Sequence, residues 1–156
     1  MRPILRWVLP AAFLSGLALG LGVYTFVYAR GASYLTNDPA ACANCHIMSE
    51  HYAAWMKSSH SAAATCNDCH TPAALVPKYA VKASNGFWHS FAFTTGEFPD
   101  PLRIKPGNQR VAEGACRKCH GEMVAAMEAV GAHAHAAGNE PVRCVHCHRY
   151  VGHWVR

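Results

Sequence analysis

The sequence has no cluster of basic residues and few charged residues of either sign. Charged side chains make up 15% of its 156 residues, and the lysines and arginines behind the formal net charge of +5 are scattered along the chain. Proteins that bind nucleic acid usually gather such residues into a patch or stripe, so we predict no nucleic-acid partner. The length suffices for one small domain rather than two.

Charge is absent altogether between Trp7 and Ala29, where Leu, Val, Ala and aromatic residues dominate. As a helix these 23 residues would extend about 34 Å, enough to cross a bilayer core of about 30 Å. A cleaved secretory signal has a shorter apolar region and ends in a small-x-small site, which Ala29-Arg30-Gly31 fits poorly. The sequence therefore predicts an uncleaved transmembrane anchor over residues 1–30 and a separate domain over residues 31–156.

No cysteine lies outside four copies of one motif, C-x-x-C-H. The copies use Cys42 and Cys45 with His46, Cys66 and Cys69 with His70, Cys116 and Cys119 with His120, and Cys144 and Cys147 with His148. In this motif the two sulfurs attach a haem through its vinyl groups and the histidine is placed to reach the iron. Zinc, a redox dithiol or four disulfides are the alternatives, but none requires a histidine after every second cysteine. We expect four covalent haems c, which themselves form the core.

Seven of the eleven histidines lie outside the motif-ending positions and are available as distal ligands. His60, six residues before the second motif, is expected to bind an iron. His153 follows the fourth motif too closely to bind the same iron comfortably and is better placed for a neighbouring haem. His146 lies between two cysteines and is expected to point outward, whereas His51 is expected to be solvated. One of His133 and His135 is a further candidate ligand.

A helix is predicted between the second and third motifs. Its first stripe, at steps of three or four residues, is Val76, Tyr79, Ala83, Phe87 and Phe91, and its second is Lys78, Lys82, Asn85 and His89. The aromatic residues near its end suit a membrane interface. The second stripe fits an ordinary wet face, or a quinol site in which a lysine and a histidine beside a haem accept protons. Residues 95–108, rich in Pro and Gly, are expected to form a loop.

These features together resemble a known family. They are the N-terminal anchor, the four motifs in two pairs, the segment Cys42 to Met48 reading C-x-x-C-H-x-M, Lys82 between motifs two and three, and the ending His148 to His153. The sequence resembles the membrane-anchored tetrahaem quinol dehydrogenases of the NapC/NirT family, and within it the small subunits of cytochrome c nitrite reductase. The fold this implies is mainly α with little regular secondary structure, around four haems.

The resemblance also implies roles for particular residues. Met48, rather than His46, would be the iron ligand of haem 1, and Lys82 would lie at the menaquinol site. His89 stands where some members have an aspartate near the open face of haem 1. The remaining iron ligands would be His70, His120 and His148 as proximal ligands of haems 2, 3 and 4, with His60 and His153 as distal ligands.

The function implied is that of a quinol-oxidising electron-transfer subunit in an oligomeric reductase complex. Electrons from menaquinol in the inner membrane would pass through the haems, on the periplasmic side, to the catalytic multihaem subunit that reduces nitrite to ammonium. Two alternatives are the same role serving a nitrate, trimethylamine N-oxide or hydroxylamine-linked reductase, and a tethered electron carrier without quinol chemistry. A terminal reductase is less well supported, since no substrate cavity can be argued from the chain.

Overall fold

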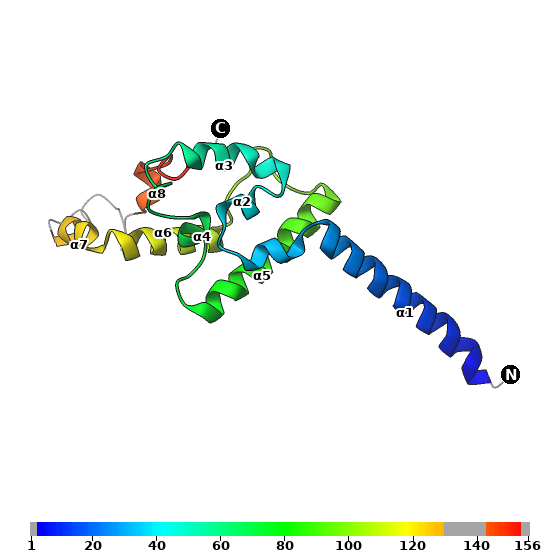
Figure 1. Ribbon diagram of the computed structural model, residues 1–156. Helices are drawn as coiled ribbons and strands as arrows, with labels where there is room; N and C mark the ends of the chain where they lie inside the picture. Colours follow the sequence, from blue (N-terminus) through cyan, green and yellow to red (C-terminus); the bar gives the residue numbers. More distant parts are fainter. Residues whose placement is uncertain (1–2, 130–142, 154–156) are drawn as a thin grey trace. The chain divides into compact units, whose positions relative to one another are not determined.

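The computed structural model describes residues 3–129 and 143–153, and every regular element within them is a helix (Figure 1). The predicted mainly α class is therefore confirmed. Internal contacts divide the chain into two units, Met1–Ser33 and Tyr34–Arg156. The predicted domain boundary at residue 30 stays a prediction, although the division falls close to it.

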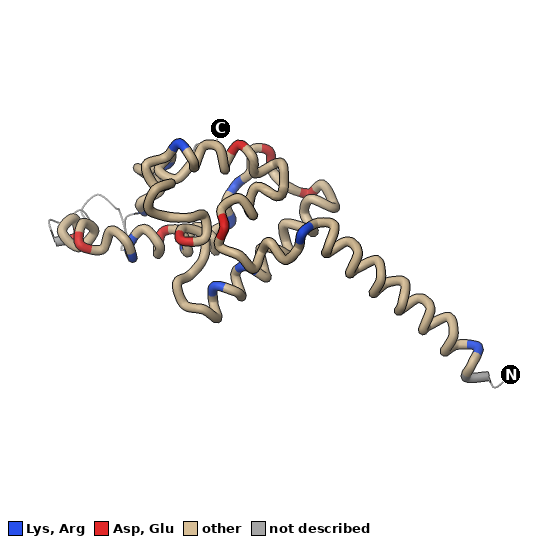
Figure 2. The backbone as a smooth tube through the Cα atoms, in the orientation of Figure 1, with Lys and Arg blue, Asp and Glu red and all other residues tan. Residues whose placement is uncertain are grey.

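The first unit is built on α1 (Pro3–Tyr28). Its stretch Leu5–Tyr28 has a mean hydropathy of 1.7 and is long and apolar enough to cross a membrane. Figure 2 shows a basic residue near the start of α1 and no charged residue along the rest of the helix. Large apolar side chains such as Trp7, Phe13 and Leu19 are exposed all around it. A helix that is apolar on every side needs lipid or protein to cover it.

The second unit consists of short helices and two longer ones. A 3₁₀ helix, η1 (Gly31–Leu35), joins the two units. The helices that follow are α2 (Pro39–Cys42), η2 (His46–Met48), α3 (Ser49–Met56), α4 (Cys66–His70), α5 (Leu75–Thr95), α6 (Pro106–Cys119), α7 (Gly121–Ala129) and α8 (Cys144–Cys147).

Local sequence explains where the two longer helices begin and end. Pro77 lies in the first turn of α5, where its missing N–H costs nothing. Gly96 ends α5 in a left-handed conformation with φ 75°, which a residue without Cβ adopts freely, and its N–H bonds to the Ala92 carbonyl. The loop predicted over residues 95–108 is shorter than expected, because Pro106 serves as the first residue of α6.

The second unit has no apolar core of its own in the part of the chain that the structure describes. No hydrophobic side chain there is buried, and the two buried side chains are Thr71 and Lys82. A domain of this size normally buries more than half of the surface that its unfolded chain exposes. Something other than side chains must therefore fill the interior, as four porphyrin rings would.

Candidate haem sites and quinol site

The first motif begins at the end of α2. Asp38 caps this helix, its Oδ1 accepting a hydrogen bond from the Ala40 N–H at 2.9 Å. Cys42 is the last residue of α2, and the 3₁₀ helix η2 starts at the histidine of the motif. His46 is exposed, whereas Met48 is half-buried. Of the two possible iron ligands, the methionine is thus the one turned toward the interior.

The second motif is the whole of α4 (Cys66–His70). The Asp68 carboxylate accepts hydrogen bonds from the N–H of Thr65 at 2.8 Å and from its hydroxyl at 2.7 Å, which fixes the start of the helix. At the other end the buried Thr71 hydroxyl donates to the Asn67 carbonyl at 2.6 Å. The motif is therefore held at both ends by local hydrogen bonds.

The third and fourth motifs are joined by an acidic side chain. Cys116 and Cys119 lie in the last turns of α6, and Cys144 starts α8. Glu113 of α6 accepts hydrogen bonds from the N–H of Cys144 at 2.7 Å and from the N–H of Val145 at 3.1 Å. Sequence reasoning missed this residue, because its partners lie more than 30 positions further along the chain.

The four motifs lie next to one another in sequence order. Helix α2 contacts α4, α4 contacts α6, and α6 contacts α8. The first cysteine of motif one, Cys42, lies within hydrogen-bonding distance of the first cysteine of motif two, Cys66. The first cysteines of motifs three and four, Cys116 and Cys144, are related in the same way. Groups attached to these cysteines would therefore form a row from the first motif to the fourth.

Two histidine pairs have the separation that a bound iron requires. The ring centres of His70 and His153 are 6.1 Å apart, and those of His60 and His120 are also 6.1 Å apart. Two imidazoles bound on opposite sides of a metal, each at about 2 Å, would have ring centres about 6 Å apart. Each pair joins a motif-ending histidine to one of the two predicted distal ligands, so the residues present fit axial ligation.

Hydrogen bonding sets the tautomer of His60. Its Nδ1 lies 3.2 Å from the Val151 carbonyl oxygen, which can accept but not donate, so Nδ1 carries the proton. The other nitrogen, Nε2, then has a free lone pair for a metal. Donation of the second ring N–H to a backbone carbonyl is the usual support of a metal-binding histidine.

Burial and neighbouring imidazoles keep His153 in the neutral form that can bind a metal. Burial, followed by the charges of His70 and His51, lowers the pKa of His153 to about 4. Burial is likewise the main cause that lowers the pKa of His70. Both rings are therefore neutral at pH 7, which is the form that binds metals.

The expectation that His51 is solvated is wrong. Helix α3 turns it inward, where its ring centre lies 5.1 Å from that of His153. Its Nδ1 is buried and, within the described residues, has no hydrogen-bond partner, and the same holds for Nδ1 of His153. No local sequence signal indicates this contact, since His51 and His153 are separated by almost the whole second unit. His133 and His135 lie outside the described residues.

Lys82 is buried beside the first motif. Its side chain is 6% exposed, and its Nζ donates to the Thr36 carbonyl at 2.6 Å and to Oδ1 of Asn37 at 3.1 Å. These acceptors immediately precede α2, which carries Cys42. Burial, and then the charge of Lys78, lowers the pKa of Lys82. Two of the three N–H donors of the ammonium are engaged in these bonds, which leaves one for a further partner.

His89 follows Lys82 on the same side of α5. Seven residues separate the two, about two turns or roughly 10 Å along the helix axis. The His89 side chain is exposed, unlike that of Lys82. The predicted pairing of a lysine and a histidine on one helix face is therefore present, with the lysine inside the domain and the histidine at its surface.

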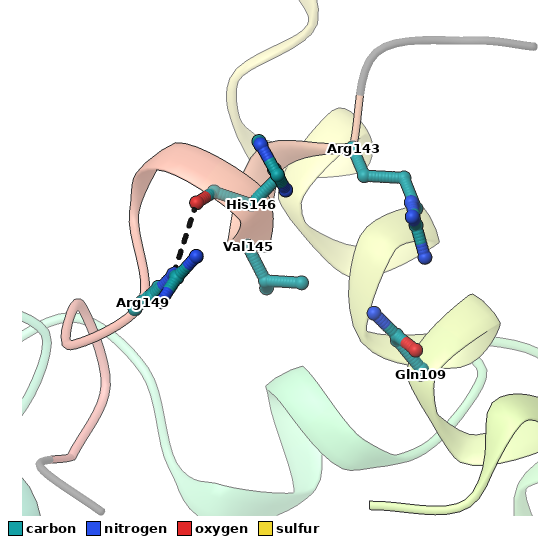
Figure 3. Close-up of a pocket in the computed structure, with 5 residues that line it drawn as sticks. All are labelled: Gln109, Arg143, Val145, His146 and Arg149. Atoms are coloured by element: carbon teal, nitrogen blue, oxygen red, sulfur yellow. Dashed lines mark hydrogen bonds between the residues drawn. The ribbon is translucent and has the colours of Figure 1, made fainter.

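A basic pocket lies beside the fourth motif (Figure 3). Its lining residues are Gln109, Arg143, Val145, His146 and Arg149. The Nε of Arg149 donates to the carbonyl of His146 at 3.3 Å. The His146 ring is exposed, as expected for a residue between the two cysteines of a motif. His146 therefore lies at the surface, as a residue that lines this pocket.

The alternatives of a zinc or disulfide protein find no support in the structure. Across residues 3–129 and 143–153, no three His, Cys, Asp or Glu side chains come together as a metal-binding group. All eight cysteines lie within the described residues, and none of them is disulfide-bonded there.

The helical fold, the apolar anchor and the motifs define a membrane-anchored multihaem cytochrome c. A model of the NapC/NirT cytochrome c family, N-terminal region, matches residues 5–156, and the chain belongs to this family. Family membership implies covalently bound c-type haem.

Two relatives and one solved structure show where in the family the similarity lies. The chain is 37% identical over 142 residues to the cytochrome c-type protein NrfH of Wolinella succinogenes, covering 88% of this chain and 80% of that protein. It is 32% identical over 143 residues to the cytochrome c nitrite reductase subunit NrfH of Nitratidesulfovibrio vulgaris, covering 90% and 81%. The fold is similar to a chain in the crystal structure of the cytochrome c nitrite reductase NrfHA complex bound to the HQNO inhibitor. That match has a TM-score of 0.58 and 30% identity, and covers 91% of this chain and 86% of that chain.

Proposed function

We propose that this chain is a membrane-anchored menaquinol dehydrogenase that passes electrons through four c-type haems to the catalytic subunit of a cytochrome c nitrite reductase. The observation that carries the proposal is the row of four motifs, with Lys82 held beside the first of them. The similarity to two NrfH proteins and to the NrfHA complex supports nitrite reductase as the partner. The haem domain would face the periplasm, where c-type haems and their partner reductase reside.

The side chains suggest how each haem would be held. His70 and His153 would bind the iron of haem 2, and His120 and His60 that of haem 3, because each pair has the required separation. Met48 would bind haem 1 and His148 haem 4. Bound haem supplies one-electron oxidation and reduction, while the protein sets position and potential.

Lys82 and His89 would handle the quinol. Oxidation of a quinol to a quinone releases two electrons and two protons. The remaining N–H donor of Lys82 would hydrogen-bond one quinol oxygen and orient the ring beside the first motif. The exposed imidazole of His89 would accept the two protons of the quinol hydroxyls in turn and release each of them to water. The two electrons would leave one at a time along the row.

Replacement of Lys82 tests the quinol site. In Lys82→Gln we expect the rate of haem reduction by a menaquinol analogue to fall by roughly tenfold to a hundredfold, the cost of losing a charge-assisted hydrogen bond. All four haems should remain attached by mass spectrometry and reducible by dithionite. Lys57→Gln, which replaces an exposed lysine at the end of α3, is the control. Quinol-driven reduction as fast in Lys82→Gln as in Lys57→Gln would refute the role of Lys82.

A further inference from the structure

Three aromatic side chains near the end of α5 form an exposed apolar surface. Phe87, Trp88 and Phe91 are 62%, 50% and 48% exposed, and their ring centres lie between 5.2 and 6.3 Å from one another. We call these three residues the α5 aromatic face. Contiguous apolar surface of this kind on a folded protein usually marks an interaction site.

The α5 aromatic face points away from the haem motifs. Phe91 follows Lys82 by nine residues, which at 3.6 residues per turn is two and a half turns, so the two lie on opposite sides of the helix. The Lys82 side is the packed side: Lys82 is buried there, and the Tyr34 ring lies 3.4 Å from where a Cβ on Gly86 would be.

Chain length keeps α5 close to the membrane surface. The apolar span ends at Tyr28, and Tyr34, which packs against Gly86, follows six residues later. Six residues of trans chain reach at most about 20 Å. The residue directly after Gly86 is Phe87, the first member of the aromatic face. The covalent connection alone thus holds this face within reach of lipid headgroups.

A cation accompanies the aromatic face. The Nζ of Lys105 lies 5.3 Å from the ring centre of Trp88, a cation–π distance. Tryptophan and phenylalanine settle at the level of the headgroups, and lysines near them bind anionic phosphates. We propose that the α5 aromatic face, together with Lys105, is a lipid-binding surface that rests in the bilayer interface, a second membrane contact beyond the anchor and separate from the quinol site.

A spin label on this face measures the contact directly. Ser84 is exposed and lies three, four and seven residues before the aromatic positions, so it shares their side of the helix. The label is attached to Ser84→Cys in the full-length haem-loaded protein in nanodiscs with anionic phospholipid. Labelling of one thiol per chain verifies that the native cysteines are occupied. Glu122→Cys, on the exposed surface of α7, is the control, and Ala80→Cys is a second site on the same side of α5.

Collision rates of the label with oxygen and with a water-soluble nickel chelate show whether lipid, water or protein surrounds the α5 aromatic face. We expect the Ser84 and Ala80 labels to collide more with oxygen than with the chelate, as in lipid, and the Glu122 label to show the reverse. Adding Phe91→Ser to Ser84→Cys should reduce the contrast. A Ser84 label as exposed to the chelate as the Glu122 label would overturn the proposal. So would a Ser84 label that neither reagent reaches, because a second copy or the reductase would then cover this face.

Discussion

At the residue level, the proposed distal ligands of two haems, His60 and His153, depend on contacts between segments far apart in the chain. His60 is fixed by the Val151 carbonyl, and His153 is turned toward His70 by the same C-terminal segment. The hydrogen bond to Nδ1 holds the His60 ring in one orientation, whereas His153 is positioned by its packing between His51 and His70. The expected state of both irons is therefore six-coordinate.

Loss of His60 should leave one iron without its distal ligand. In His60→Ala we expect one of the low-spin haems to become high-spin, because no other imidazole in the described residues shares the position opposite His120. Electron paramagnetic resonance of the oxidised protein reports the change. The exposed His146 provides the control, since His146→Ala should keep the wild-type spectrum. Identical spectra for both variants would contradict the pairing of His60 with His120.

The ligand of haem 1 is testable in the same way. Met48 is half-buried and His46 exposed, but His120 and His148 are exposed as well, so the proposal of Met48 rests on the family resemblance. In Met48→His we expect a stronger-field ligand to change the spectrum of one haem and to slow its reduction by quinol. His46→Gln should change neither. If the effects were reversed, with His46→Gln altering the haem and Met48→His silent, the histidine would be the ligand.

Much of this residue-level account could be predicted from the sequence. His70, His120 and His148 are expected as iron ligands because C-x-x-C places the following histidine beside the ring, whereas Met48 is expected only from the family resemblance. The inward position of His51 could not be predicted, since it depends on how the C-terminal segment folds back over α3. Nor does spacing alone reveal which distal histidine faces which motif.

At the level of elements, Glu113 is the contact that joins α6 to α8. Its carboxylate satisfies two N–H groups at the start of α8, a helix of four residues that has no side-chain cap of its own. Such a short helix is not stable by itself. The fourth motif therefore depends on α6 for its position.

Neutralising Glu113 should loosen the fourth motif. We expect Glu113→Gln to lower the free energy of unfolding by about 2 kcal/mol, because bonds to a charged acceptor are replaced by weaker ones to an amide. Differential scanning calorimetry of the haem-loaded protein should show a midpoint lower by several degrees. Glu97→Gln, an exposed acid in the loop after α5, should leave the midpoint unchanged. Equal midpoints for the two variants would contradict the role of Glu113.

The elements themselves were predictable to different degrees. Helix α5 follows from its two stripes, and the structure places it at Leu75–Thr95, around the predicted positions. Helix α6 was not predicted, and its first residues fell in the predicted loop because Pro106 is typical of loops as well as of a first helical position. The bond from Glu113 to α8 has no local sequence signal at all.

At the scale of the whole molecule, the four motifs follow one another in space in the same order as in the sequence. Electrons would enter beside Lys82 at the first motif and leave at the fourth, next to the basic pocket of Arg143 and Arg149. Each neighbouring pair of motifs is in direct contact through its helices.

The central claim is transfer from menaquinol to nitrite, and one measurement tests it most directly. The protein is purified gently from membranes together with the subunits that accompany it. Haem absorbance is then followed after mixing with a menaquinol analogue and, once the haems are reduced, with nitrite. The account predicts reduction by the quinol and reoxidation upon addition of nitrite, with ammonium as product and a larger multihaem subunit present. Haems that the quinol does not reduce, while dithionite does, would contradict it.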